Sequence, residues 1–317
     1  MNDAHQEELA ALLETEPTLT RRPTVKTLEE RLYKPIHILD HGFVRLIDYM
    51  GDDGAIVQAA RVSYGAGTKS VRNDRGLIRY LMRHRHTTPF EMCEIKLHVK
   101  LPIFVARQWI RHRTANVNEY SARYSILDRE FYVPALEHVS EQSATNRQGR
   151  GDNVPEAKAR AVIDALRRDA MTVYDTYEHL INDTGDGTPV REGEPQLARE
   201  LARMNLGLNY YTQWYWKVDL HNLLHFLSLR MDPHAQYEIR VYADAIATMV
   251  EDWVPHAWSA FADYRVGGSF FARQEVEILK AILKGEDPDV LLPASDLSFR
   301  ERKEFRERLD LGPPKRG

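Results

Sequence analysis

The sequence is poor in cysteine and in long apolar segments. Cys93 is the only cysteine among 317 residues, which excludes a disulfide framework and a cysteine-based zinc site within one chain. No apolar run is long enough to cross a bilayer, and residues 1–20 are polar and acidic, without the apolar core of a signal peptide. These absences predict a cytoplasmic protein that has no membrane partner.

The chain also lacks a large excess of charge of either sign. It has 43 Lys and Arg against 47 Asp and Glu, a formal net charge of −4. A protein that coats nucleic acid needs an extended basic surface, so no nucleic-acid partner is expected, and local basic clusters suggest small anionic ligands. A chain that is 43% hydrophobic and 28% charged has the composition of a folded protein with a large core.

Common phosphate-binding and nucleophile signatures are missing as well. The glycine-containing residues 65–70 fail the P-loop spacing, and Ser70 stands where the third glycine of G-x-G-x-x-G is required, so a flexible glycine turn is the better interpretation. Cys93 is expected to be a small buried hydrophobe on an alternating strand. No serine lies in a G-x-S-x-G turn, and Ser121 has no adjacent histidine base. Covalent attack by the protein is therefore not predicted.

A metal site is not predicted either. His84, His86 and Glu91 could supply nitrogen and oxygen ligands. However, Arg83 and Arg85 alternate with the histidines, and their positive charges oppose a divalent cation.

What the sequence does contain is a dense polar run over residues 108–124. A helix over residues 102–113, begun by its proline, would place three polar side chains on one face, namely Gln108, Arg111 and His112. An extended chain beyond it would point another three to one side, namely Glu119, Ser121 and Arg123. Such a set suits an anionic ligand with a flat ring, a nucleotide or a flavin. A charged helix end and the solvated face of a strand are the structural alternatives.

A second cluster falls on a predicted helix over residues 219–231. Asp219 is a plausible N-cap, and His221 and His225 are neighbours at i and i+4. Arg230 either caps the carbonyl groups at the helix end or stabilises negative charge that develops on a bound ring. Arg203 is a further cation with an ordinary surface interpretation.

Hydrophobic periodicity predicts an α+β fold of one main domain. Strands are expected at residues 36–49 and 91–100, and residues 208–218 fit either a strand or a buried helix. The predicted helices, besides the two above, cover residues 52–62, 72–85, 155–182, 196–206, 234–254, 255–264 and 275–283. Polar or glycine-rich loops are expected at residues 140–155 and 183–195.

These residues together resemble the flavin-dependent thymidylate synthases, a family often written ThyX. The family signature is Arg-His-Arg, seven residues and then Ser, and it is matched here by residues 111–113 and Ser121. The resemblance extends from about residue 36 to about residue 267. It includes, in the same order, residues 60–63, 86–91, 102–108 and 229–230. Residues 1–35 and 268–317 are therefore expected to be extensions, the first loosely ordered and the second helical and charged.

The resemblance implies a fold and a reaction. The fold would be of the ThyX type, a mixed sheet packed with several helices, in a homotetramer whose sites are shared between subunits. The reaction would be methylation of dUMP to dTMP without a cysteine nucleophile. Methylenetetrahydrofolate would give the carbon, FAD would carry the hydride and NADPH would reduce the flavin.

The resemblance also implies roles for individual residues. FAD would be held by Thr88, Arg111, His112, Arg113, Glu119, Asp219, Leu220, His221 and His225. The dUMP would be held by Gln108, Trp109, Ile110, Arg111, Glu119, Tyr120, Ser121, Ala122, Arg123, Arg203 and Arg230. Arg230 would be the catalytic residue, because a guanidinium can stabilise an anionic uracil and cannot itself lose its proton.

Four positions depart from the family pattern. Asn116 stands where serine is common, and Asp219, His221 and His225 stand where the family often has Asn, Arg and Asn. An ionised Asp219 cannot donate a hydrogen bond as asparagine does.

Two other function classes fit parts of the pattern. A nucleotide- or RNA-binding module could stack bases on Tyr120, Tyr124, Trp214 and Trp216. A flavin reductase would use the same flavin groups without methyl transfer.

Overall fold

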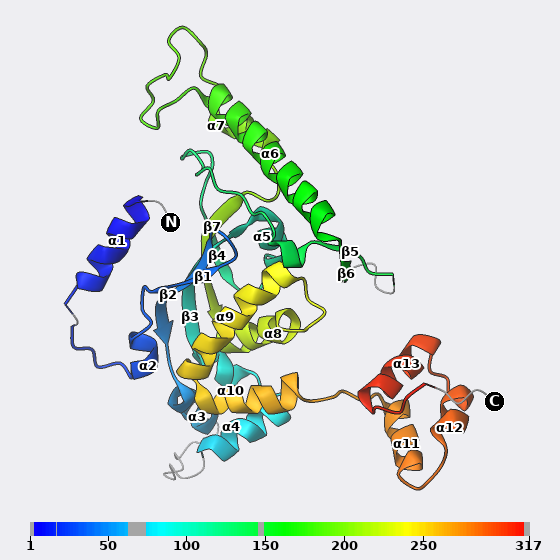
Figure 1. The fold of residues 1–317 in the computed structure, drawn as a ribbon. Helices are drawn as coiled ribbons and strands as arrows, with labels where there is room; N and C mark the ends of the chain where they lie inside the picture. The colour runs from blue at the N-terminus through cyan, green and yellow to red at the C-terminus, as the bar shows by residue number, and fades with distance from the viewer. Residues whose placement is uncertain (1–2, 17, 63–73, 145–148, 314–317) are drawn as a thin grey trace. The chain divides into compact units, whose positions relative to one another are not determined.

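The computed structural model describes residues 3–16, 18–62, 74–144 and 149–313 (Figure 1). The chain divides into two compact units, Met1–Phe261 and Ala262–Gly317. All the candidate site residues belong to the first unit. The predicted glycine turn at residues 65–70 lies outside the described residues.

A five-stranded antiparallel sheet forms the centre of the first unit, in the order β1-β2-β3-β7-β4. The strands are β1 (Pro35–Ile38), β2 (Gly42–Met50), β3 (Glu94–Pro102), β4 (Asn116–Glu119) and β7 (Tyr211–Asp219). The predicted strand region at residues 36–49 is confirmed as the pair β1 and β2, and residues 208–218 are resolved as a strand. The strand predicted at residues 91–100 is confirmed only from Glu94 on, because Glu91 and Met92 belong to a 3-10 turn that Cys93 ends. The expectation of a mixed sheet is wrong for these strands, because each neighbouring pair runs antiparallel.

One face of this sheet is apolar and carries helices. Opposed residues in β3 and β7, such as Leu97 and Trp216 or Val99 and Trp214, point to the same face and are buried. Trp109 of α5 (Ile103–Trp109), Phe226 of α8 (Leu220–Arg230) and Tyr242 of α9 (Tyr237–Trp253) form ring contacts on this face. In Figure 1, α8 and α9 lie together over the sheet.

The opposite face is polar, although it is also buried in part. Arg45 Nε donates to His98 Nδ1 at 2.9 Å, and the other ring nitrogen of His98 lies 3.0 Å from Gln213 Oε1. The Lys100 ammonium pairs with Glu130. Alternation along each strand therefore separates an aromatic core from a charged network.

The remaining helices of the first unit are α1 (Asp3–Glu14), α2 (Lys26–Glu29), α3 (Asp53–Val62), α4 (Asp74–Arg83), α6 (Glu156–Ile181), α7 (Arg199–Ala202) and α10 (Pro255–Phe261), with short 3-10 turns η2 (Thr88–Met92), η3 (Leu136–His138) and η4 (Arg203–Asn205). The helices from residue 53 on follow the predicted pattern with shorter ends, whereas α1 and α2 form in a stretch that was expected to be loosely ordered. Asp52 is the N-cap of α3, since its Oδ1 accepts from Ala55 N at 2.9 Å. The predicted loop at residues 140–155 is wrong in part, because it contains the paired strands β5 (Ser140–Gln142) and β6 (Arg150–Asn153).

The second unit has a small core of its own. After the π-helix η5 (Ala262–Val266), it contains α11 (Arg273–Ile282), α12 (Pro288–Ala294) and α13 (Phe299–Arg308). Its buried side chains are Ile278, Leu292, Leu297 and Phe305. Across the described part of the chain, no helix is both long and apolar enough to cross a membrane.

Candidate active site

The polar run begins where α5 ends, at Trp109. The indole of Trp109 is fully buried between Trp214, Trp216 and Phe226, with ring centroids 4.6 to 5.9 Å apart. The helix predicted to reach residue 113 therefore stops four residues early. The chain must instead turn toward the edge strand β4. Arg111 and His112 lie outside the helix, so the predicted helical face shared with Gln108 is wrong.

The turn exposes two cations that are two residues apart in the sequence. Arg111 and Arg113 are exposed, and among the described residues neither guanidinium has a hydrogen bond or an ion pair. The residues between and after them, His112 and Thr114, contact α8 instead. Two unpaired forks at an exposed turn are suited to an anion with several oxygens, such as a phosphate.

His112 and Arg230 are brought together across 118 residues of sequence. Arg230 Nε donates to His112 Nε2 at 3.1 Å, which requires the neutral imidazole to carry its proton on Nδ1. The imidazole also packs edge-on against Phe226, with centroids 5.0 Å apart, and lies 6.0 Å from the His225 ring. Burial, then the charge of Arg230 and that of His225, lower the pKa of His112 to about 4. His112 is therefore a hydrogen-bond acceptor at neutral pH.

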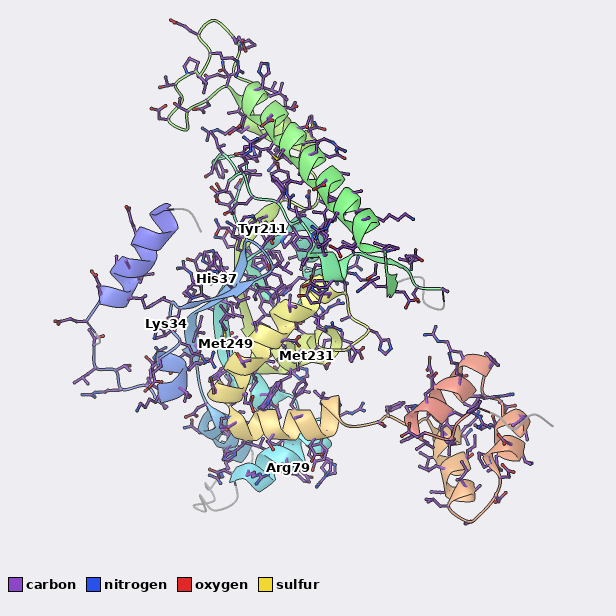
Figure 2. All side chains as sticks on the ribbon, viewed as in Figure 1. Lys34, His37, Arg79, Tyr211, Met231 and Met249 are labelled. Carbon is purple, nitrogen blue, oxygen red and sulfur yellow. The ribbon has the colours of Figure 1, made fainter. Side chains whose placement is uncertain are left out.

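Arg230 is the last residue of α8, and only part of its guanidinium is hydrogen-bonded. It directly precedes Met231, which is labelled in Figure 2 at the helix end. Burial lowers the pKa of Arg230, although the guanidinium stays charged at any physiological pH. Its Nε is used by His112, whereas its terminal nitrogens have no hydrogen bond to any residue that the structure describes.

Glu119 lies at the end of β4, on the face that carries α5 and α8. It is opposite Trp214 in the sheet, and its carboxylate accepts a hydrogen bond from Thr212 Oγ1 at 2.7 Å. The extended chain predicted to continue to residue 124 ends here. Tyr124 N donates to the carbonyl oxygen of Ser121 at 3.0 Å, which makes residues 121–124 a turn. The predicted alternation beyond Glu119 is therefore wrong.

The turn after β4 is held by contacts on both sides. The Tyr120 hydroxyl donates to the Ile126 carbonyl at 3.0 Å, and Arg123 pairs with Glu200 at 3.2 Å. Ala122 is half-buried beside the core that contains Tyr177. Arg123 is thus an exposed cation that already has a carboxylate partner.

Asp219 is the N-cap of α8, as predicted. Its Oδ1 accepts from Asn222 N at 2.9 Å and its Oδ2 accepts from Asn222 Nδ2 at 2.7 Å. Asn222 Oδ1 in turn accepts from Thr114 Oγ1 at 2.8 Å. Sequence reasoning missed Asn222, although its spacing from Phe226 and Arg230, four and eight residues later, signals a shared helix face.

The other assigned residues differ in how open they are. Leu220 and Trp109 are fully buried, so their side chains cannot touch a ligand. His221 and Gln108 are half-buried, and Gln108 Oε1 is a buried acceptor without a partner among the described residues. The side chains of three other assigned residues are exposed to solvent, namely Thr88, Ile110 and His225.

Two assigned residues are not joined to this cluster. Thr88 begins the short turn η2, and Arg203 begins η4. Within the described ranges, no hydrogen bond or ion pair connects either of them to Arg230 or to residues 111–113. The turn η2 nevertheless packs against α8 in the same chain, whereas side-chain contacts join His112 to Arg230 and His225 and join Thr114 to Asn222.

Comparison with known proteins identifies the family. Residues 45–256 match the family described as "Thymidylate synthase complementing protein". A protein of Ruegeria pomeroyi named flavin-dependent thymidylate synthase is 62% identical over 288 residues, which cover 91% of this chain and 92% of the relative. A protein of the same name from Gluconobacter oxydans is 60% identical, covering 93% of this chain and 94% of its own.

Solved structures agree with the sequence relatives. The UMP/dUMP methylase PolB from Streptomyces cacaoi, bound with 5-Br UMP, superposes with a TM-score of 0.62 and 32% identity, covering 73% of this chain and 98% of that chain. The same methylase bound with 5-Br dUMP gives a TM-score of 0.62 at 31% identity, over 73% of this chain and 99% of that chain. The resemblance inferred from the sequence is confirmed: the chain belongs to the thymidylate synthase complementing protein family, in which its relatives are named flavin-dependent thymidylate synthases.

Proposed function

We propose that this chain catalyses the reductive methylation of dUMP to dTMP. The carbon donor is 5,10-methylenetetrahydrofolate, and NADPH-reduced FAD is the source of the hydride. The names of the relatives support a flavin, and the methylase structures bound to brominated UMP and dUMP support a uracil nucleotide. The single observation that carries the proposal is the contact between Arg230 and His112 beside two unpaired arginines.

The residues around this contact fit FAD. The unpaired forks of Arg111 and Arg113 match the oxygens of a diphosphate, and the neutral ring of His112 and the exposed ring of His225 add flat polar surface. When bound, FAD supplies hydride chemistry that no side chain can supply. Glu119, Thr88, Asp219 and His221 complete the proposed FAD set, together with the backbone of the buried Leu220.

Arg230 is proposed to act on the uracil ring of dUMP. Its Nε is held by His112, which leaves the terminal nitrogens to donate to a uracil carbonyl or an ionised N3. A fixed guanidinium in a partly buried site stabilises negative charge on the ring more than water does, and that charge makes C5 more nucleophilic. Residues 108–111, 119–123 and Arg203 are proposed to hold the nucleotide, with the buried Trp109 contributing only its backbone.

No thiol is needed for this reaction. Cys93 is fully buried in the first unit, and burial raises the pKa of its thiol to about 12. A protonated thiol in the core is a poor nucleophile. Activation of uracil by Arg230 is therefore the proposed route.

We further propose a homotetramer in the cytoplasm, with sites shared between subunits. Arg203 shares no hydrogen bond or ion pair with the Arg230 cluster among the described residues of one chain. Completion of the site by a neighbouring subunit would account for this missing contact.

An Arg230→Ala variant tests the assignment. We expect dTMP formation to fall at least about 100-fold with the fold retained, as for loss of one fixed donor to a developing anion. Reduced flavin equilibrated in D2O should transfer deuterium into dTMP only when dUMP and methylenetetrahydrofolate are both present. Arg300→Ala, which removes an exposed arginine paired with Glu304, is the matched control.

The same assay separates the alternatives. A colourless protein that ignores added FAD would indicate the binding module. Flavin oxidation without dTMP would indicate the simple reductase. Turnover of Arg230→Ala at the rate of the unmodified protein would refute the role of Arg230.

A further inference from the structure

The turn that carries Arg111 and Arg113 is tied to α8 at two points. His112 contacts Phe226 and Arg230 near the end of the helix. Thr114 contacts Asn222 near its beginning. The residues that contact α8 are His112 and Thr114, and the two arginines that alternate with them make neither contact.

The tie at Thr114 is a chain of three side chains. Thr114 Oγ1 donates to Asn222 Oδ1 at 2.8 Å, and Asn222 Nδ2 donates to Asp219 Oδ2 at 2.7 Å. Since a carboxylate only accepts, the amide nitrogen of Asn222 must face Asp219 and the amide oxygen must face Thr114. Asp219 also caps the helix through Asn222 N at 2.9 Å. The orientation of the amide is therefore fixed by the helix start.

The two ties reach the same side of α8. Asn222, Phe226 and Arg230 repeat every four residues and form one stripe about 12 Å long on the helix. His112 and Thr114 contact this stripe from the turn after α5, in which His112 N donates to the Trp109 carbonyl at 2.9 Å. Arg111 and Arg113, which alternate with them, are exposed and take no part in either tie.

We propose that Asn222 and Asp219 are positioning residues that act through Thr114 to hold Arg111 and Arg113 together on the ligand side of the turn. The inference rests on the proposed function, in which these arginines bind FAD. It gives Asp219 a role that does not require it to donate to the flavin. Both carboxylate oxygens of Asp219 are already used by Asn222.

Substitutions at Thr114 and Asn222 test this role. Thr114 is exposed, and Thr114→Val removes the hydroxyl with little change in volume. Asn222→Ala removes the amide and leaves the backbone N–H that Asp219 caps. Thr114→Ser keeps the hydroxyl, and Thr248→Val is a matched control, since Thr248 is an exposed helical residue bonded only to the Ala245 carbonyl.

Two measurements are made on the full chain. Titration with FAD gives its dissociation constant, and hydrogen exchange of the ligand-free protein reports the backbone over residues 110–115. Thr114→Val and Asn222→Ala are expected to raise the dissociation constant about 5- to 10-fold, as for loss of one hydrogen bond, and to speed exchange in this segment. The double variant should be no worse than either single one, because both break the same chain. Thr114→Ser should match the unmodified protein.

Three results would overturn the proposal. The first is an FAD dissociation constant of Thr114→Val and Asn222→Ala equal to that of Thr248→Val. The second is a double variant whose loss of FAD affinity is the product of the two single losses. The third is faster hydrogen exchange over residues 110–115 without weaker FAD binding. An unmodified protein that binds no FAD would instead overturn the proposed function. The exchange arm would then still decide whether Asn222 holds the turn.

Discussion

Burial moves the pKa values of His112 and Cys93 in opposite directions, because each group avoids the charge it would carry. The pKa of His112 falls to about 4 and that of Cys93 rises to about 12. Both groups are therefore neutral across the physiological range. A neutral His112 can accept from Arg230, and a neutral Cys93 cannot attack a substrate.

The titration of His112 can be followed by NMR of its ring. We expect a midpoint near pH 4, against a usual value of about 6.5. Because the unfolded chain takes up this proton first, the contribution of His112 to stability is present above about pH 6.5 and declines as the pH falls toward 4. Arg230→Ala should raise the midpoint, since a neighbouring positive charge is lost. A midpoint near 6.5 in the unmodified protein would contradict the buried contact.

The thiol of Cys93 is expected to resist labelling in the native protein at pH 8 and to react once the protein is unfolded. Cys93→Ala should keep dTMP formation within about twofold and lower the free energy of unfolding by about 1 kcal/mol, because a small buried group is lost. Urea unfolding and the dTMP assay measure the two effects. If a folded Cys93→Ala variant formed no dTMP, the result would show that the reaction requires the thiol.

At the scale of elements, the sequence pattern predicted those strands and helices whose positions depend on neighbouring residues in the chain. The alternation at the start of β3 and the capped stripe of α8 were predicted correctly, because one buried face sets the period there. From Leu97 on, β3 is buried on both faces. The length of α5 and the turn after β4 were not predicted, because they depend on distant partners. Trp109 is held by rings from β7 and α8, and β4 pairs with β7 about 100 residues later. The local spacing placed Asn222 on a shared helix face, but its contact with Thr114, 108 residues earlier in the chain, gave no local signal.

The aromatic cluster around Trp109 is expected to contribute most to the stability of the segment that leads into the turn with Arg111 and Arg113. Trp109→Ala is expected to lower the free energy of unfolding by about 3 to 5 kcal/mol, because it leaves a large cavity between Trp214, Trp216 and Phe226. Tyr124→Ala, at a ring that is 77% exposed, should change it by less than about 0.5 kcal/mol. Urea unfolding compares the pair. Equal losses would contradict this assignment of the core.

At the scale of the whole molecule, the two units have separate cores. Every candidate site residue lies in Met1–Phe261, whereas Phe305 and its neighbours form the core of Ala262–Gly317. The predicted boundary near residue 267 stays a prediction. A unit of this size has little surface to bury and is close to its stability limit.

Phe305→Ala is therefore expected to unfold the second unit alone. The loss of a fully buried ring costs about 3 to 5 kcal/mol, which a small core cannot absorb. Hydrogen exchange should lose protection over residues 273–308 and keep it in β3 and β7. FAD binding should stay within about twofold. Loss of FAD binding would show that the second unit supports the site.

The cluster of Trp109, Trp214 and Trp216 has a practical consequence. The indoles of Trp109 and Trp216 lie next to Phe226, whose ring contacts His112 at the proposed flavin site, and Trp214 contacts Trp109. Indole emission overlaps flavin absorption, and energy transfer over such short separations is efficient. The chain thus carries a built-in optical reporter: quenching of its native fluorescence should follow occupancy of the site without any attached dye.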